Sequence, residues 1–143
     1  MKRINLSVVL CGAMLAFSAS AQANDSQKYY DTGAQLITKF RSCSTIPNQV
    51  SIEVSRCLDE SSSLINKKTN ELKQKHAATI KRDDSAVWDL LDSKNQVGNL
   101  KQACAEIYPD ALRVHFKNQI RSCQIQLDLN RFFYIYDYVI NFG

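Results

Sequence analysis

The chain has 143 residues and a formal net charge of +4, from 18 basic and 14 acidic side chains. The charges are spread along the sequence and form no concentrated basic stretch of the kind that binds nucleic acid. Only four glycines and two prolines occur, which is too few turn-forming residues for a β-sandwich of this size. The composition therefore predicts an all-α protein and argues against nucleic acid as a partner.

The first 23 residues have the pattern of a secretory signal peptide. Two basic residues precede an apolar run from Leu6 to Phe17, and small residues follow as far as Ala23. The apolar run is about 12 residues long, too short to cross a bilayer of roughly 30 Å. The bulky Leu10 immediately before Cys11 argues against lipidation and a stable membrane anchor. We expect cleavage after Ala23 and export to the bacterial periplasm or beyond.

Cleavage would leave residues 24–143 as a single domain, which reduces 143 residues to 120 and five cysteines to four. The basic side chains fall from 18 to 16, so the net charge falls from +4 to +2. An even number of cysteines in an exported chain indicates disulfides, and the spacing lacks the close pairs of zinc sites. Three pairings are possible. We expect Cys43–Cys57 and Cys104–Cys123, because each pair flanks one proline-marked break.

The first two predicted helices are separated by a proline. Asp25 or Ser26 can cap the first helix, which carries apolar residues at three- and four-residue steps and should end near Cys43. The second helix should begin near Asn48. Three consecutive serines, Ser61–Ser63, suggest a break within it. Its basic residues alternate with acidic ones, which favours a solvated face over an anion site.

The last two predicted helices meet at Pro109. Two acidic residues followed by Ser85 supply a start signal for the third helix, in which we expect Trp88 to be a core residue. The fourth helix should run from Asp110 towards the C-terminus. Residues 132–138 are apolar or aromatic on nearly all sides, a pattern that a strand can also show. A helix is favoured because the segment continues a helical pattern without turn residues. The expected fold is a small disulfide-stapled bundle of about four helices.

No catalytic constellation is recognisable in the sequence. His76 and His115 fall on predicted helices without a neighbouring Cys or Ser motif, and no H-E-x-x-H zinc-protease motif occurs. The carboxylates are scattered or grouped at helix starts, which is no indication of the paired carboxylates of a glycosidase. We therefore expect a protein that has no enzymatic activity, metal or cofactor and that acts by binding.

The aromatic C-terminal segment supplies the candidate binding residues. If the segment is helical and its largest apolar residues face the core, Tyr134 and Tyr138 project together on another face. Tyrosine is enriched at protein interfaces. Arg131 and Asp137 lie nearby and can orient a partner through charge. We expect this surface to contact a protein partner or a second copy of the chain in a homodimer.

The order of cysteines and helices also carries a family resemblance over residues 43–131. The resembling features are Cys43 and Cys57, Leu64-Ile65-Asn66, Glu71-Leu72, a tryptophan-bearing helix ending in Cys104, and Cys123 with Arg131. This layout resembles the LprI-type lysozyme inhibitor family. The resemblance implies a helical periplasmic protein that binds and blocks a muramidase or another peptidoglycan hydrolase, as an inhibitor or immunity protein does. It assigns no inhibitory residue. The alternative is a periplasmic adaptor of a secretion or envelope-assembly system.

Overall fold

A computed structural model of the protein describes residues 25–78 and 94–142. The chain divides into two compact units between Thr32 and Gly33. In the first unit, residues 25–32 are helical, with Tyr29 buried and Tyr30 exposed. The predicted signal peptide, the start of the third predicted helix and Trp88 lie outside the described residues.

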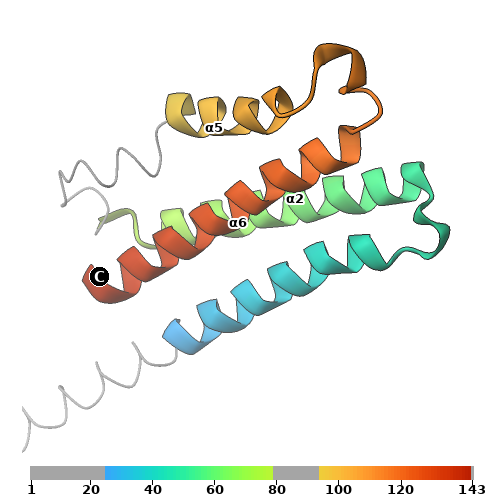
Figure 1. The fold of residues 1–143 in the computed structure, drawn as a ribbon. Coiled ribbons are helices and arrows are strands. Elements are labelled where there is room, and N and C mark those ends of the chain that lie inside the picture. Colours follow the sequence, from blue (N-terminus) through green and yellow to red (C-terminus); the bar gives the residue numbers. More distant parts are fainter. Residues whose placement is uncertain (1–24, 79–93, 143) are drawn as a thin grey trace, which may run out of the picture. The chain divides into compact units, whose positions relative to one another are not determined.

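The second unit is a small all-α bundle stapled by two disulfides, which confirms the predicted fold class (Figure 1). Its elements are a helix over residues 33–42, the short 3₁₀ helices η1 (Cys43–Thr45) and η2 (Pro47–Gln49), α2 (Ser51–Lys75), α5 (Lys94–Glu106), the 3₁₀ helix η3 (Asp110–Leu112) and α6 (Lys117–Phe142). Residues 25–78 and 94–142 contain no strand. The aromatic C-terminal segment is therefore helical, as predicted. No helix in these ranges is long and apolar enough to cross a membrane.

Both predicted disulfide pairings are confirmed. Cys43 joins Cys57 with their Cα atoms 5.5 Å apart, and Cys104 joins Cys123 at 5.8 Å. Near the first disulfide, Asn48 adopts a left-handed conformation with φ 58° and ψ 7°. Asparagine tolerates this conformation better than most residues. It interrupts the helical backbone, so α2 begins at Ser51, slightly later than predicted.

The predicted break at Ser61–Ser63 is wrong, because α2 continues through all three serines. Ser61 is buried, and its hydroxyl donates a hydrogen bond to the Cys57 carbonyl oxygen four residues earlier, at 2.9 Å. Thr69 donates to the Ile65 carbonyl oxygen in the same way, at 2.8 Å. A buried hydroxyl that bonds back to its own helix is satisfied without leaving helical geometry. The serine cluster is consequently compatible with an unbroken core helix.

The core of the second unit lies where α2 packs along α6. Buried residues of both helices recur at three- and four-residue steps, the spacing of one helix face. These residues are Val54, Leu58, Ser61, Ile65, Thr69 and Leu72 of α2, and Ile125, Asp128, Leu129, Phe132, Ile135 and Val139 of α6. The two helices run in the same direction, since Asn118 contacts Ser51 and, further along both helices, Arg121 contacts Asp59.

Gly33 allows the helix over residues 33–42 to approach α6 closely. A Cβ atom at this position would lie 2.6 Å from Cε1 of Phe133, closer than a carbon–carbon contact permits. A larger residue at position 33 would displace the Phe133 ring.

An ion pair between a buried carboxylate and a half-buried ammonium joins α5 to α6. The Lys101 ammonium donates a 2.8 Å hydrogen bond to Oδ2 of Asp128, whose side chain is only 2% exposed. The ammonium also lies 2.6 Å from Oδ1, but that oxygen has no hydrogen bond of acceptable geometry within the described residues. Gln124 of α6 donates to the Lys101 carbonyl oxygen at 3.2 Å. Asp128 thus lies among the buried residues of α6, and its ion-pair partner comes from α5.

An exposed ion pair joins the helix over residues 33–42 to α2. The Lys39 ammonium donates a 2.9 Å hydrogen bond to Glu60. This hydrogen bond, with the positive charge of Lys39 and a smaller contribution from Arg56, holds the pKa of Glu60 below its usual 4.5. A lowered folded-state pKa means that the pair stabilises the fold above the unfolded pKa and loses this effect as the pH falls through the folded value.

We therefore expect Lys39→Met to raise the pKa of Glu60 towards 4.5. The measurement is an NMR titration of the Glu60 side-chain carboxyl in the intact protein. Lys67→Met, at an exposed position further along α2, is the matched control and should leave the Glu60 titration unchanged. A Glu60 pKa that is the same in wild type and Lys39→Met would contradict the ion pair.

Candidate protein-binding surface

The connection between α5 and α6 is a fixed loop at one end of the second unit. We call residues 107–116 the clamped loop. The Cys104–Cys123 disulfide closes its base by joining the last turns of α5 to the first turns of α6. The 3₁₀ helix η3 occupies its centre and follows Pro109, whose carbonyl oxygen accepts a 2.8 Å hydrogen bond from the Leu112 amide. The loop therefore has ordered backbone between its two helices.

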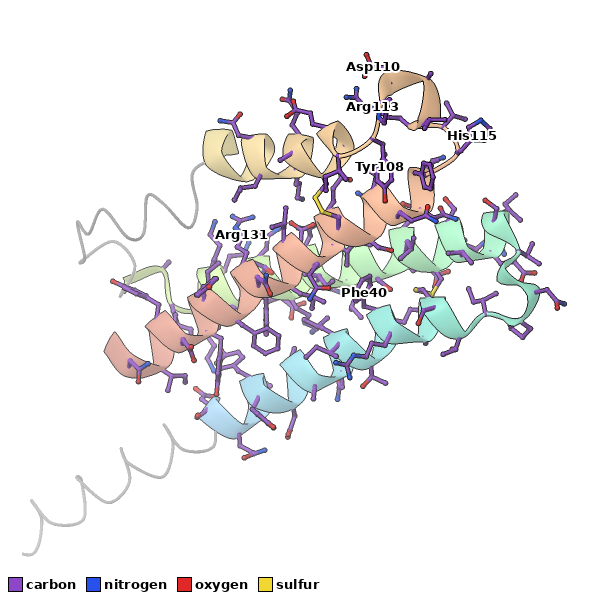
Figure 2. The ribbon with its side chains drawn as sticks, viewed as in Figure 1. Phe40, Tyr108, Asp110, Arg113, His115 and Arg131 are labelled. Carbon is purple, nitrogen blue, oxygen red and sulfur yellow. A yellow bond between two sulfur atoms is a disulfide. The ribbon has the colours of Figure 1, made fainter. Side chains whose placement is uncertain are left out.

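Side chains inside the clamped loop fix it further. Arg113 Nε donates hydrogen bonds to the carbonyl oxygens of Ala105 and Tyr108, at 3.1 and 3.3 Å. Its Nη1 lies 2.6 Å from a carboxylate oxygen of Asp110. The rings of Tyr108 and Phe116 stack with their centroids 4.4 Å apart. Figure 2 shows Asp110 and Arg113 together at the outer end of the loop. A disulfide, a ring stack and an arginine bonded to the backbone thus hold the same ten residues.

Three aliphatic side chains of the clamped loop are exposed to solvent. Ile107, Leu112 and Val114 are 70%, 44% and 82% exposed. Val50 and Ile52, at the start of α2, are also exposed. The start of α2 lies at the same end of the unit, because Asn118 in the first turn of α6 donates a 3.3 Å hydrogen bond to the Ser51 carbonyl oxygen. We call these five residues the apolar end; gathered apolar exposure of this kind marks interaction sites.

Basic side chains lie beside the apolar end. Arg113, Lys117 and Arg121 line one hollow of about 230 Å³, together with Asp59 and polar residues of α2 and α6. Arg113 is paired with Asp110, and Arg121 Nε lies 3.3 Å from Asp59. The exposed Lys117 side chain has no ion pair among the described residues. Its positive charge is therefore left uncompensated between two neutralised arginines.

A second hollow of about 410 Å³ adjoins the Cys43–Cys57 disulfide. It is lined by Phe40, Arg41, Cys43, Ser44, Val54, Leu58, Asn118, Gln119 and Ser122. Asn118 lines both hollows. The first turns of α6 therefore separate two depressions at the end of the unit that carries the clamped loop.

The exposed tyrosine pair expected from the sequence does not exist. Tyr134 is 59% exposed, but Tyr138 is only 8% exposed. Tyr138 follows Ile135 by three residues and adjoins Val139, so it lies beside the buried stripe and not opposite it. Asp137 is exposed and Arg131 half-buried on α6. The spacing of apolar residues predicted correctly that this segment is helical, but it placed the buried face of α6 about one residue away from its position in the structure.

Sequence reasoning missed the clamped loop. The predicted fourth helix starts at Asp110, whereas α6 begins at Lys117. His115, expected on a helix, lies in the turn before α6 and is exposed, and Figure 2 shows it at the outer side of the loop. The available signal was Pro109, which has no amide hydrogen to continue the hydrogen bonds of a helix.

The described residues hold no cluster of three or more His, Cys, Asp or Glu side chains that could bind a metal ion. All four cysteines among them are in disulfides, so none is a free thiol nucleophile. No family model, curated protein or solved structure matches the chain. The geometry of this surface is therefore the main basis for a functional proposal.

Proposed function

We propose that this protein acts by binding another protein, and that the partner is a peptidoglycan hydrolase whose activity it blocks. The observation that carries the proposal is the clamped loop. Its Ile107, Leu112 and Val114 side chains are exposed to solvent, and its backbone is fixed by a disulfide and a ring stack. Exposed aliphatic side chains on a loose loop would lose conformational freedom on binding. Fixing the loop beforehand removes much of that cost.

Three further features support this proposal. The layout of cysteines and helices resembles that of exported lysozyme inhibitors. Two disulfides suit a protein that works in an oxidising compartment. A blocking protein also needs no reacting groups of its own, and the described residues offer neither a free thiol nor a metal cluster.

The experiment is to mix the purified disulfide-bonded protein, residues 24–143, with a panel of muramidases and peptidoglycan amidases and to measure residual activity. We expect at least one hydrolase to be inhibited at a one-to-one ratio, and the protein alone to cleave no peptidoglycan. The reduced and alkylated protein is the matched control and should inhibit weakly. If the panel stays fully active and an envelope-assembly component is recovered as a stable complex, the adaptor function replaces this proposal.

A further inference from the structure

We infer that the apolar end and Lys117 enter the substrate cleft of the hydrolase and lie against its acidic residues. This inference rests on the proposed function and adds to it the contact surface and the chemistry of the partner's site. It names one occupant for the surface: the cleft of a glycan-cleaving enzyme.

The shape of the clamped loop suits insertion into a cleft. The clamped loop connects the end of α5 to the start of α6 and projects beyond both helices in the ribbon (Figure 1). Ile107 and Val114, its two most exposed aliphatic residues, are 70% and 82% exposed. A fixed loop with apolar side chains at its outer side is suited to a concave site, and ligand sites on enzymes are concave and mostly apolar with a few polar groups.

The charge of the hollow beside the apolar end suits the same site. Glycoside hydrolases place two carboxyl groups on either side of the bond that they cleave. Asp110 of the clamped loop pairs with Arg113, and Asp59 of α2 pairs with Arg121 of α6. Among the described residues, the Lys117 side chain has no acidic partner. Lys117 lines the same hollow as Arg113 and Arg121. The ionisable side chains that line this hollow are three basic residues and Asp59, so the hollow carries a net positive charge, which complements an acidic cleft.

The C-terminal surface expected from the sequence exposes less aromatic area than predicted. Tyr138 is buried, so Tyr134 is left as a single exposed aromatic residue on its part of α6. Scattered single apolar residues are normal on protein surfaces, whereas the apolar end gathers five residues from two segments. Tyr134 therefore serves as a control position.

The test uses two charge-changing variants and two matched controls in the disulfide-bonded protein. Val114→Asp places a carboxylate at the most exposed aliphatic position of the loop, and Lys117→Glu reverses the uncompensated charge. Leu100→Asp, on the exposed face of α5, and Lys67→Glu, on α2, make the same chemical changes elsewhere. Inhibition constants are measured against the hydrolase that the wild-type protein blocks. We expect each test variant to weaken inhibition at least about tenfold and each control to stay within about twofold.

The outcomes separate the inference from the proposed function. If the wild-type protein inhibits and both test variants inhibit as well as their controls, the surface is wrong and the inhibitor function stands. If Tyr134→Ala weakens inhibition more than Lys117→Glu does, the binding face is the C-terminal one and the inference is also overturned. If the wild-type protein inhibits no hydrolase, both fall. Circular dichroism melting verifies folding; should Val114→Asp unfold, Lys117→Glu alone decides.

Discussion

Replacing Lys101 by methionine should lower the free energy of unfolding by about 3–5 kcal/mol. The Asp128 carboxylate is 2% exposed, and Lys101 supplies its ion pair from α5. Methionine keeps much of the lysine volume but removes the ammonium, so a buried carboxylate would lose its neutralising charge. The cost of an unpaired buried charge is larger than that of most single substitutions. Urea denaturation followed by circular dichroism measures the effect.

The matched control is the double variant Lys101→Met with Asp128→Leu. It removes both charges and leaves apolar side chains of similar size between α5 and α6. Replacing a complete buried ion pair by packed apolar residues is often neutral or stabilising, so the double variant should recover most of the stability lost by the single one. A single variant as stable as wild type would show that Asp128 is solvated in solution. The account of the α5–α6 contact would then be wrong.

Removing the Cys104–Cys123 disulfide by a double change to serine should cost about 2–5 kcal/mol. The closed loop spans 19 residues, which corresponds to roughly 3 kcal/mol in the chain-entropy model. A second effect is expected at the binding surface. Without the disulfide, the ends of α5 and α6 are no longer covalently joined at the base of the clamped loop. Inhibition of the hydrolase should therefore weaken even under conditions where the variant remains folded.

The Cys43–Cys57 disulfide provides the control, because its sequence separation of 14 residues gives a similar loss of stability. It does not close the clamped loop. The two double-serine variants should therefore melt at similarly lowered temperatures, and below those temperatures the Cys104–Cys123 variant should inhibit more weakly. Equal inhibition constants for the two folded variants would mean that the loop disulfide contributes to stability alone.

The two disulfide pairings could be predicted from the sequence because the residues that determine them are close together in the chain. Each proline marked a helix boundary, and each boundary was flanked by the cysteines that pair across it. The register of α6 was harder to predict. Its last turns carry large apolar residues on every side, so the three- and four-residue pattern does not distinguish the face of Tyr138 from that of Tyr136. Packing of neighbouring helices along Ile125, Phe132 and Ile135 decides the buried face, and this tertiary information is absent from the pattern.

The clamped loop and the buried serines illustrate two other limits of sequence reasoning. Leu112 has the spacing of an apolar residue in a helix. Only the stacking of Phe116 on Tyr108 shows that the chain turns between these two residues before α6 begins. Ser61 resembles a helix breaker in the sequence, yet its hydroxyl bonds to the carbonyl oxygen of Cys57 and the helix continues. In both cases a contact formed in the folded chain determined the local conformation, and residue type alone did not.

Whether the protein blocks a hydrolase through its substrate cleft can be measured as the inhibition of the susceptible enzyme at increasing concentrations of a soluble peptidoglycan fragment that the enzyme cleaves. Occupation of the cleft predicts competitive inhibition, in which the apparent inhibition constant rises linearly with the substrate concentration and kcat is unchanged. Inhibition that lowers kcat and does not weaken as the fragment concentration rises would place the binding face outside the cleft and contradict the account.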